Sequence, residues 1–223
     1  MEGRNQEGDL KTISLSEFES SSEDQTQTKE VLEKGGLVCF PTASGYKIVA
    51  DLMSPAAITS MLQAKRRVRN APALVFIPDE SWLDRVAARV SDEARKLIAR
   101  FWPGAVTLLF EASEDLHPKV RRPLTKAKGW LGVRVPEDGV ALALVRGFGR
   151  PVLVSSANLA RKGGAHSVAQ VKKNFGRTVD VLVDGGDLPE LPKSTLVDVT
   201  NGSPSVVRAG AIPAERIHEA LAG

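Results

Sequence analysis

Short apolar runs that end at a proline constrain the fold of this chain more than any other feature of its sequence. Residues 37–40 are followed directly by Pro41, and residues 73–77 are followed by Pro78. Runs that are this short and apolar throughout are typical of strands buried on both faces of a sheet. Proline ends such a strand because it has no backbone N–H to donate to the ladder. We therefore predict a sheet whose central strands are covered on both sides.

Segments with a helical spacing of apolar residues lie between these strands. Ser54 and Pro55 form a good N-cap and first-turn pair. Ser22, with Gln25 three residues later, resembles a capping box that opens a helix to about residue 34. The predicted helices cover residues 22–34, 54–67, 80–88, 92–101, 140–146 and 168–175, and the predicted strands cover residues 10–15, 37–40, 73–77, 106–111, 131–135, 152–155, 179–183, 195–200 and 205–207. This interleaving predicts an α/β or mixed α+β fold.

Length and composition are those of one globular domain. The chain has 223 residues, of which 42% are hydrophobic and 26% are charged, so a single core can bury most of its apolar surface. We predict a flexible N-terminal tail at residues 1–9 and one domain at residues 10–223. The sequence has no apolar run of about 18 residues and no apolar stretch near Met1 that is typical of a signal peptide. We therefore expect no membrane span and a cytoplasmic protein, with its only cysteine, Cys39, in the core.

Polar or glycine-containing loops follow several of the predicted strands. Residues 41–47 come directly after the strand at 37–40, and residues 155–158 (Ser-Ser-Ala-Asn) follow the strand that begins at Val152. Because open α/β sheets place ligands beyond the carboxyl ends of their strands, both loops are candidate binding segments. Hydroxyls, an amide and backbone N–H groups in such loops suit phosphate, amine or carboxylate recognition. Taken alone, each loop is also compatible with an ordinary turn.

Basic side chains gather in two short stretches, although the formal net charge is only +3. The first stretch exceeds what capping a helix C-terminus needs, so we predict that it binds an anionic ligand, most simply a triphosphate. The second is typical either of solvated surface or of a patch that attracts RNA. The first comprises Lys65, Arg66, Arg67 and Arg69, and the second comprises Lys119, Arg121, Arg122, Lys126 and Lys128.

The C-terminal region contains a predicted hairpin. The strands at 195–200 and 205–207 flank Asn201 and Gly202, which form a hairpin signal. Pairing of these strands would place the charge of Arg208 beside the hydroxyl of Ser194.

Several other chemistries have no support in the sequence. His117, His166 and His218 are scattered without metal-ligand spacing, so we expect them to be plain surface residues. The sequence has no Gly-x-Gly-x-x-Gly motif, no Walker-type loop and no Gly-x-Ser-x-Gly elbow. A dinucleotide fold and a serine hydrolase are therefore not indicated.

The candidate segments, taken in order, resemble the YrdC family. Its usual pattern begins Pro-Thr-acid-Thr-x-Tyr-Gly-Leu and continues with Lys-x-Arg-Pro, Asn-Pro-Leu, Trp-Pro-Gly-x-x-Thr, Val-Arg-x-Pro and Ser-Ala-Asn. The resemblance covers about residues 10–212, and several weak blocks in the same order make it specific. The matching residues are Pro41, Thr42, Ser44, Tyr46, Lys65, Arg67, Pro72, Trp102, Pro103, Gly104, Thr107, Val133, Arg134, Val135, Pro136, Ser156, Ala157, Asn158, Asp184, Gly185, Gly186, Ser194, Thr195, Asp198, Arg208 and Gly210.

The resemblance implies a single YrdC-like domain, in which a twisted mixed sheet and its helices surround a concave basic pocket. It implies a threonylcarbamoyl-AMP synthase, a nucleotidyltransferase that condenses L-threonine, bicarbonate and ATP with Mg²⁺ and releases pyrophosphate. A partner complex would then transfer the threonylcarbamoyl group to an adenosine in tRNA. The residues that the resemblance places around ATP are Lys65, Arg67, Ser156, Asn158 and Arg208, and those that it places around threonine are Ser44, Tyr46, Arg134 and Ser194.

The sequence departs from the family pattern mainly on the threonine side. Ala43 stands where the family usually has Asp or Glu, and Phe76 stands where many synthases carry a histidine near the threonine carboxylate. Lys47 replaces a glycine and adds a charge at the mouth of the pocket. Val68 replaces the proline of Lys-x-Arg-Pro, and Trp130 replaces a small polar residue. We therefore predict that ATP binds well and that threonine binds more weakly than in a typical family member.

Two other interpretations remain open. The same basic concavity could bind double-stranded RNA in a non-catalytic or ribosome-associated member of the family. A paralogue could also act on another carbamoyl adenylate or nucleotide. Pyrophosphate release that depends on both threonine and bicarbonate would separate the synthase from these alternatives.

Overall fold

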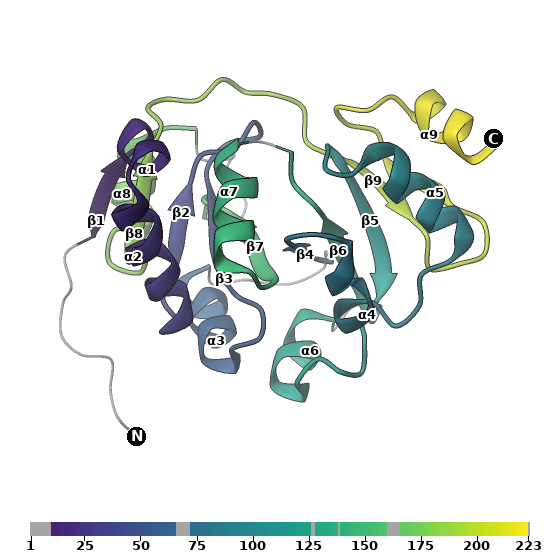
Figure 1. Ribbon diagram of the computed structural model, residues 1–223, viewed down its shortest axis with the longest axis horizontal. Coiled ribbons are helices and arrows are strands. Elements are labelled where there is room, and N and C mark those ends of the chain that lie inside the picture. The colour runs from purple at the N-terminus through teal and green to yellow at the C-terminus, as the bar shows by residue number, and fades with distance from the viewer. Residues whose placement is uncertain (1–9, 66–71, 126–127, 138, 160–165, 223) are drawn as a thin grey trace.

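A ten-stranded mixed sheet runs through the molecule, and helices lie on both of its faces (Figure 1). The computed structural model describes residues 10–65, 72–125, 128–137, 139–159 and 166–222. The strands are β1 (Lys11–Ser14), β2 (Val38–Phe40), β3 (Lys47–Asp51), β4 (Ala73–Phe76), β5 (Val106–Glu111), β6 (Trp130–Arg134), β7 (Val152–Ser156), β8 (Val181–Asp184), β9 (Thr195–Asp198) and β10 (Ser205–Arg208). The helices are α1 (Leu15–Ser20), α2 (Ser22–Glu33), α3 (Pro55–Ala64), η1 (Glu80–Trp82), α4 (Leu83–Val86), α5 (Asp92–Phe101), α6 (Pro118–Leu124), α7 (Gly139–Phe148), α8 (Val168–Phe175) and α9 (Ala214–Ala222). Over these ranges no helix has both the length and the apolar character needed to cross a membrane.

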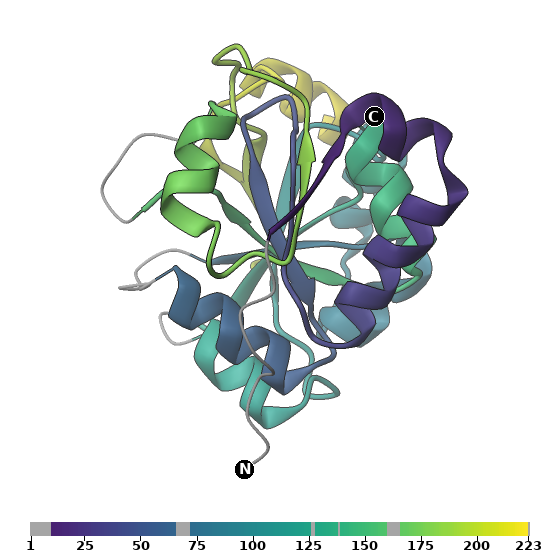
Figure 2. The ribbon, with the colours of Figure 1, turned by 90° about the vertical axis from the view of Figure 1, so that its left-hand side faces the viewer.

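The strand order determines which loops meet at each end of the sheet. The order is β1-β8-β2-β3-β7-β4-β6-β5-β9-β10. Neighbouring strands are parallel in the pairs β1–β8, β8–β2, β4–β6 and β5–β9, and antiparallel in the others. The strand β7 is therefore antiparallel to both of its neighbours, β3 and β4. Figure 2 shows the strands fanning through a strong twist, as expected of a large sheet.

Successive side chains of the central strands enter two separate cores, one on each face of the sheet. The first core joins Cys39 and Val75 to helices α3, α5, α6, α8 and α9, and the second joins Phe40 and Phe76 to helices α1, α2 and α7. Figure 2 shows α3 and α8 on the opposite side of the strands from α1, α2 and α7. The prediction that the central strands are covered on both sides is confirmed, and Cys39 is buried as expected.

The second core does not extend along the whole sheet. It takes residues from β1, β8, β2, β3, β7 and β4 and, among the residues that the structure describes, none from β6, β5, β9 or β10. On this face Arg134 of β6 lies directly opposite Phe76 of β4. Polar side chains thus begin where the second core stops, and this boundary positions the candidate site.

Most of the predicted elements are present, and α5, β5 and α8 have the predicted bounds. The sequence analysis missed α1, β3, α6 and α9. The strand β3 escaped notice because it starts at Lys47 and ends at Asp51, two charged residues that are nevertheless buried. The helix α6 contains Pro123 as well as starting at Pro118, and proline in a sequence ordinarily signals a break.

Two local predictions are wrong in detail. The capping box belongs to Ser14 and Glu17 at the start of α1, whereas α2 is capped by Ser21 rather than by Ser22. The strands β9 and β10 are antiparallel as expected. The first of them ends at Asp198 and not at the predicted residue 200, so residues 199–204, which include Asn201 and Gly202, join the two strands.

Candidate functional site

Lys65 follows the last residue of α3 and reaches across to the end of β7. Its ammonium group donates to the backbone carbonyls of Ser156 and Asn158 and lies 3.4 Å from Oδ1 of Asn158. The same ammonium lies 5.2 Å from the ring centre of Phe175 on α8. Only 7% of Lys65 is exposed. The structure therefore brings three residues predicted around ATP into direct contact.

The loop between β2 and β3 folds back on itself through its own side chains. Oγ1 of Thr42 donates to the carbonyl of Gly45 at 2.8 Å and accepts the N–H of Ser44 at 3.3 Å. Gly45 has a φ of 91°, in the left-handed region that favours glycine. The ammonium of Lys47 donates to the carbonyl of Ser44 at 2.8 Å. These bonds hold the half-buried Ser44 beside the start of β3.

Tyr46 supports this loop from inside the core. Its hydroxyl donates to the carbonyl of Gly186 at 2.7 Å and accepts the N–H of Gly185 at 3.0 Å. Burial raises the pKa of Tyr46 to about 12, although the bond from Gly185 opposes the rise. The residue has no exposed surface. We predicted that Tyr46 lines the threonine side. Its hydroxyl holds the backbone at Gly185 and Gly186, and a contact with threonine stays a prediction.

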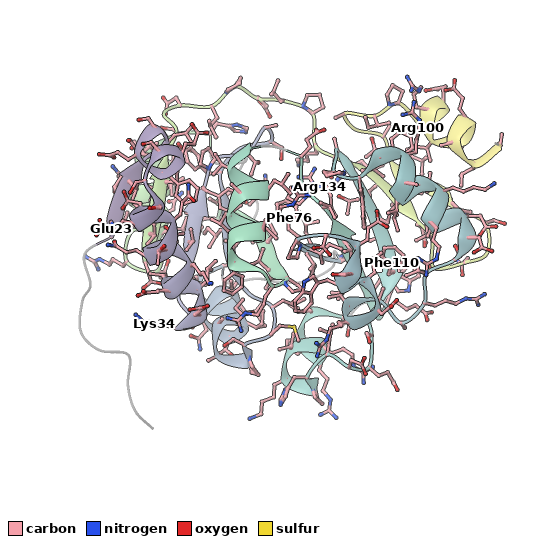
Figure 3. The ribbon with its side chains drawn as sticks, viewed as in Figure 1. Glu23, Lys34, Phe76, Arg100, Phe110 and Arg134 are labelled. Carbon is pink, nitrogen blue, oxygen red and sulfur yellow. The ribbon has the colours of Figure 1, made fainter. Side chains whose placement is uncertain are left out.

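Arg134, the last residue of β6, stacks on Phe76, the last residue of β4 (Figure 3). The guanidinium carbon lies 4.8 Å from the centre of the phenyl ring, and the two residues are direct partners across parallel strands. Phe76 is fully buried in the second core, and 9% of Arg134 is exposed. The buried ring therefore supports the guanidinium from one side, and cation–π attraction stabilises the stacked pair. An arginine held in this way presents planar N–H groups that suit a carboxylate.

Ser194, Thr107 and Arg208 come together beside Arg134. Oγ of Ser194 lies 2.9 Å from Oγ1 of Thr107, and Arg208 donates from Nη2 to the backbone carbonyl of Ser194 at 2.9 Å. We predicted that Arg208 lies beside the hydroxyl of Ser194, and the contact is instead to its carbonyl. Continuing the register of β5 and β6 by one residue places Thr107 opposite Arg134. The hydroxyls of Ser194 and Thr107 thus extend the row that Phe76 and Arg134 begin.

Thr195 fastens the segment after β10 to the start of β9. Its hydroxyl accepts the N–H groups of Gly210 and Ile212 at 3.0 and 3.1 Å and donates to the carbonyl of Ile212. A side-chain carbon on Gly210 would lie 2.2 Å from the carbonyl oxygen of Lys193, so only glycine permits this approach. The buried Thr195 hydroxyl therefore fixes the backbone on both sides of the contact between Ser194 and Arg208.

The predicted residues form two groups at the two ends of β7. Lys47 is the partner of Ser156 at one end, and Phe76 is the partner of Val152 at the other. Directly opposite residues share a face and side chains alternate along a strand, so both pairs lie on the same face. At about 3.3 Å per residue, the two ends of β7 are roughly 13 Å apart. The Lys65 group comprises Lys47, Lys65, Ser156 and Asn158, and the Arg134 group comprises Phe76, Thr107, Arg134, Ser194 and Arg208.

The second basic cluster belongs to neither group. It lies on and just after α6, where Arg121 forms an ion pair with Glu114 at 3.4 Å and Lys128 stacks 4.7 Å from the ring centre of Trp130. Binding of RNA at this cluster stays a prediction. The predicted ATP ligand Arg67 lies outside the described residues, as do Arg66, Arg69 and Lys126.

Some contacts of the site had no signal in the sequence. Phe175 of α8 lies 5.2 Å from the ammonium of Lys65 at the end of α3, a contact between segments that are far apart in the sequence. His117, expected to be a plain surface residue, accepts the N–H of Lys119 at 3.1 Å on Nδ1 and caps α6. A His-Pro pair before a helix is the only local pattern from which this cap could have been predicted.

Comparison with known proteins indicates one family. A family model named for Sua5, YciO and YrdC and described as telomere recombination matches residues 30–210. A threonylcarbamoyl-AMP synthase of Pyrococcus abyssi is 31% identical over 190 residues, which make up 85% of this chain and 55% of that protein. The chain therefore spans about half the length of this relative.

Solved structures show the same likeness. Pyrococcus abyssi Sua5 complexed with L-threonine matches with a TM-score of 0.80 and 28% sequence identity, over 95% of this chain and 59% of that one. Escherichia coli YciO matches with a TM-score of 0.74 and 25% identity, over 91% of this chain and 94% of that one. The predicted fold class, α/β with a large mixed sheet, is confirmed by these matches.

Proposed function

This chain belongs to the Sua5, YciO and YrdC family, and on that basis we propose that it is a threonylcarbamoyl-AMP synthase. It condenses L-threonine, bicarbonate and ATP, releases pyrophosphate, and supplies the threonylcarbamoyl group for tRNA modification. One observation carries the proposal: two separate cationic groups, the Lys65 group and the Arg134 group, lie at the two ends of β7. A threonylcarbamoyl adenylate carries a phosphate and the free carboxylate of threonine at separate places, so two separate cationic groups suit it.

The Lys65 group binds the triphosphate of ATP in this proposal. Charge-assisted hydrogen bonds from an ammonium group are among the strong contacts that phosphate oxygens accept. Lys65 is already held against the loop that carries Ser156 and Asn158, whose hydroxyl and amide add neutral donors. Arg208 contacts Ser194 in the Arg134 group, so its predicted role at ATP, like that of Arg67, remains a prediction.

The Arg134 group binds threonine. The guanidinium of Arg134 takes the carboxylate as a bidentate pair, which its position over the ring of Phe76 favours. The hydroxyl of Ser194 is a polar partner for the amine or hydroxyl of threonine. Ser44 lies beside Lys47 at the other end of β7, so its predicted contact with threonine remains a prediction.

The reaction needs no covalent enzyme intermediate. The amine of threonine and bicarbonate form a carbamate and release water. A carbamate oxygen then attacks the α-phosphorus of ATP, the bond from that phosphorus to the bridging oxygen breaks, and pyrophosphate leaves with both electrons of the bond. The protein contributes in-line positioning and stabilisation of negative charge on the phosphates. Buried cations at the two ends of β7 suit this task.

Mg²⁺ is proposed to arrive with ATP. Over the ranges that the structure describes, no group of three or more His, Cys, Asp or Glu side chains could hold a metal ion. These residues do not fit a metal site of their own, so Mg²⁺ would be bound mainly by the phosphates. No step is assigned to it.

Incubation of the purified protein with labelled threonine, bicarbonate, ATP and Mg²⁺ tests the proposal. We expect an adenylate product on chromatography and pyrophosphate release that requires both threonine and bicarbonate. Release that needs no threonine would contradict the synthase and favour a paralogue with another substrate. Absence of turnover, together with duplex RNA binding that falls steeply with salt, would favour the RNA-binding alternative.

A further inference from the structure

Lys47 places a second buried ammonium group near that of Lys65. It is the first residue of β3, and 8% of it is exposed. Its neighbours across the sheet are Phe40 on β2 and Ser156 on β7. The carbonyl of the same Ser156 accepts a hydrogen bond from Lys65. Lys65 therefore bonds the backbone of the residue that lies directly opposite Lys47 in the sheet.

The buried thiol of Cys39 is influenced by both charges. Burial raises the pKa of this thiol, and the positive charges of Lys47 and Lys65 both oppose the rise. Like charges that share a poorly solvated neighbourhood repel each other, and an anion bound between them relieves that repulsion.

The ammonium of Lys47 lies at the loop between β2 and β3, where it donates to the carbonyl of Ser44 at 2.8 Å. The loop is also more positive than the family pattern, because Ala43 stands for an acid and Lys47 stands for a glycine. One negative charge is lost and one positive charge is gained, a change of two charges beside the Lys65 group.

We propose that Lys47 is an additional phosphate-binding residue of this chain and that it holds, together with Lys65, the polyphosphate of a nucleoside triphosphate. This assignment rests on the proposed ATP site and extends it. A polyphosphate concentrates several negative charges within a short length, which suits two neighbouring ammonium groups better than a single carboxylate does. ATP and pyrophosphate should therefore gain more from Lys47 than AMP does.

The test is calorimetric titration of ATP, pyrophosphate and AMP into the wild type and four variants. Lys47→Met removes the charge at similar length, and Lys47→Gln keeps N–H donors that can still bond the carbonyl of Ser44. We expect both to bind ATP and pyrophosphate at least about tenfold more weakly, with a smaller change for AMP. Lys65→Met should show a comparable loss. Lys34→Met removes the same charge from a side chain that is 76% exposed at the end of α2 (Figure 3) and should match the wild type.

Wild-type affinity for ATP and pyrophosphate in Lys47→Gln would overturn the assignment, because the residue would then serve only to hold the Ser44 loop. Thermal unfolding of each variant separates lost binding from lost fold, and Lys47→Gln decides the question if Lys47→Met does not fold. A wild type that binds pyrophosphate through Lys47 but forms no threonylcarbamoyl adenylate would overturn the proposed synthase and support this assignment. A wild type that binds neither ATP nor pyrophosphate would overturn both.

Discussion

The Lys65 group and the Arg134 group occupy opposite ends of one strand, and their charges are held in different ways. In the Lys65 group, ammonium groups on flexible stems donate to backbone carbonyls of Ser44, Ser156 and Asn158. In the Arg134 group, a planar guanidinium rests on a buried ring, and the register of β4 and β6 fixes the pair.

This difference bears on how each group recognises its ligand. An ammonium is a compact charge with three rotatable donors, so it can adapt to a polyphosphate that itself has many conformations. A guanidinium fixed on a ring presents its donors in one plane and suits one orientation of a carboxylate. We therefore expect the loss of one ammonium in the Lys65 group to lower nucleotide affinity partly, and the loss of the Arg134 guanidinium to abolish threonine binding.

The largest effect is expected for Arg134→Ala. Loss of the bidentate partner should weaken threonine binding by about a hundredfold or more, to below detection. The measurement is titration of threonine in the presence of a non-hydrolysable ATP analogue. Arg100→Ala is a matched control, because Arg100 also stacks on a phenylalanine, Phe101, at 5.8 Å but is exposed on α5 (Figure 3).

Phe76→Leu in the same titration tests the ring itself. It should retain measurable threonine binding that is weaker than in the wild type, since cation–π attraction is lost while burial is kept. Full affinity in Phe76→Leu would show that the register alone positions Arg134, and the comparison between the two groups would lose its basis.

A smaller effect is expected for Lys65→Met at the other end of β7. One charge-assisted contact is lost, so ATP should bind about ten- to a hundredfold more weakly, while threonine affinity changes little. Lys128→Met is the control, because Lys128 is also stacked on an aromatic ring but is exposed near α6. An equal loss of ATP affinity in both variants would indicate a general effect of net charge and not a defined contact.

Thr195→Val should chiefly affect stability. The change removes the acceptor of two backbone N–H groups, from Gly210 and Ile212, and should lower the free energy of unfolding by about 1–3 kcal/mol. Thr195→Ser keeps the hydroxyl and should lose much less. Urea unfolding of the two variants measures the difference, and equal losses would mean that the methyl group, not the hydroxyl, holds the segment.

The smallest effect is expected for Asp51→Asn, whose position shares the cross-sheet row of Val152 and Phe76. Burial raises the pKa of Asp51, and the N–H of Met53 and the charge of Arg150, at 3.3 Å, oppose the rise. Because the pKa of Asp51 is raised in the folded state, the protonated carboxyl contributes to the stability of the fold. This contribution is fully present below the unfolded-state pKa of about 3.9 and is lost as pH rises through the folded-state pKa.

Asparagine is neutral at every pH, so the stability of Asp51→Asn relative to the wild type should improve between about pH 4 and pH 7. Denaturant unfolding at the two pH values measures this trend. The opposite trend would show that the ion pair between Asp51 and Arg150 outweighs the effect of burial.

The fold could be predicted where local signals were strong. The run at 37–40 ends at a proline, and α5 begins at Asp92 after a serine cap, so their boundaries were evident in the sequence. The strand β3 was missed because its charged ends, Lys47 and Asp51, are buried by neighbouring strands that no local pattern reveals. Propensity describes a segment by itself, and here tertiary packing decided the outcome.

The site could be predicted only through the order of its motifs. Lys65 and Asn158 are 93 residues apart, and Thr107 and Ser194 are 87 apart, so no spacing rule joins them. The resemblance to a family identified these residues as related, and the structure shows that they are in contact. It did not indicate that Tyr46 faces the core, because a tyrosine in a loop motif carries no sign of which way it points.

The length of β7 also sets the distance between the Lys65 group and the Arg134 group. Because side chains alternate along a strand, one inserted residue between Val152 and Ser156 would lengthen the separation by about 3.3 Å and turn Ser156 to the opposite face. A ligand whose anionic ends are spaced differently from the ends of this strand can engage one group but not both. Discrimination by length would then follow from the number of residues in β7, without any contact to the middle of the ligand.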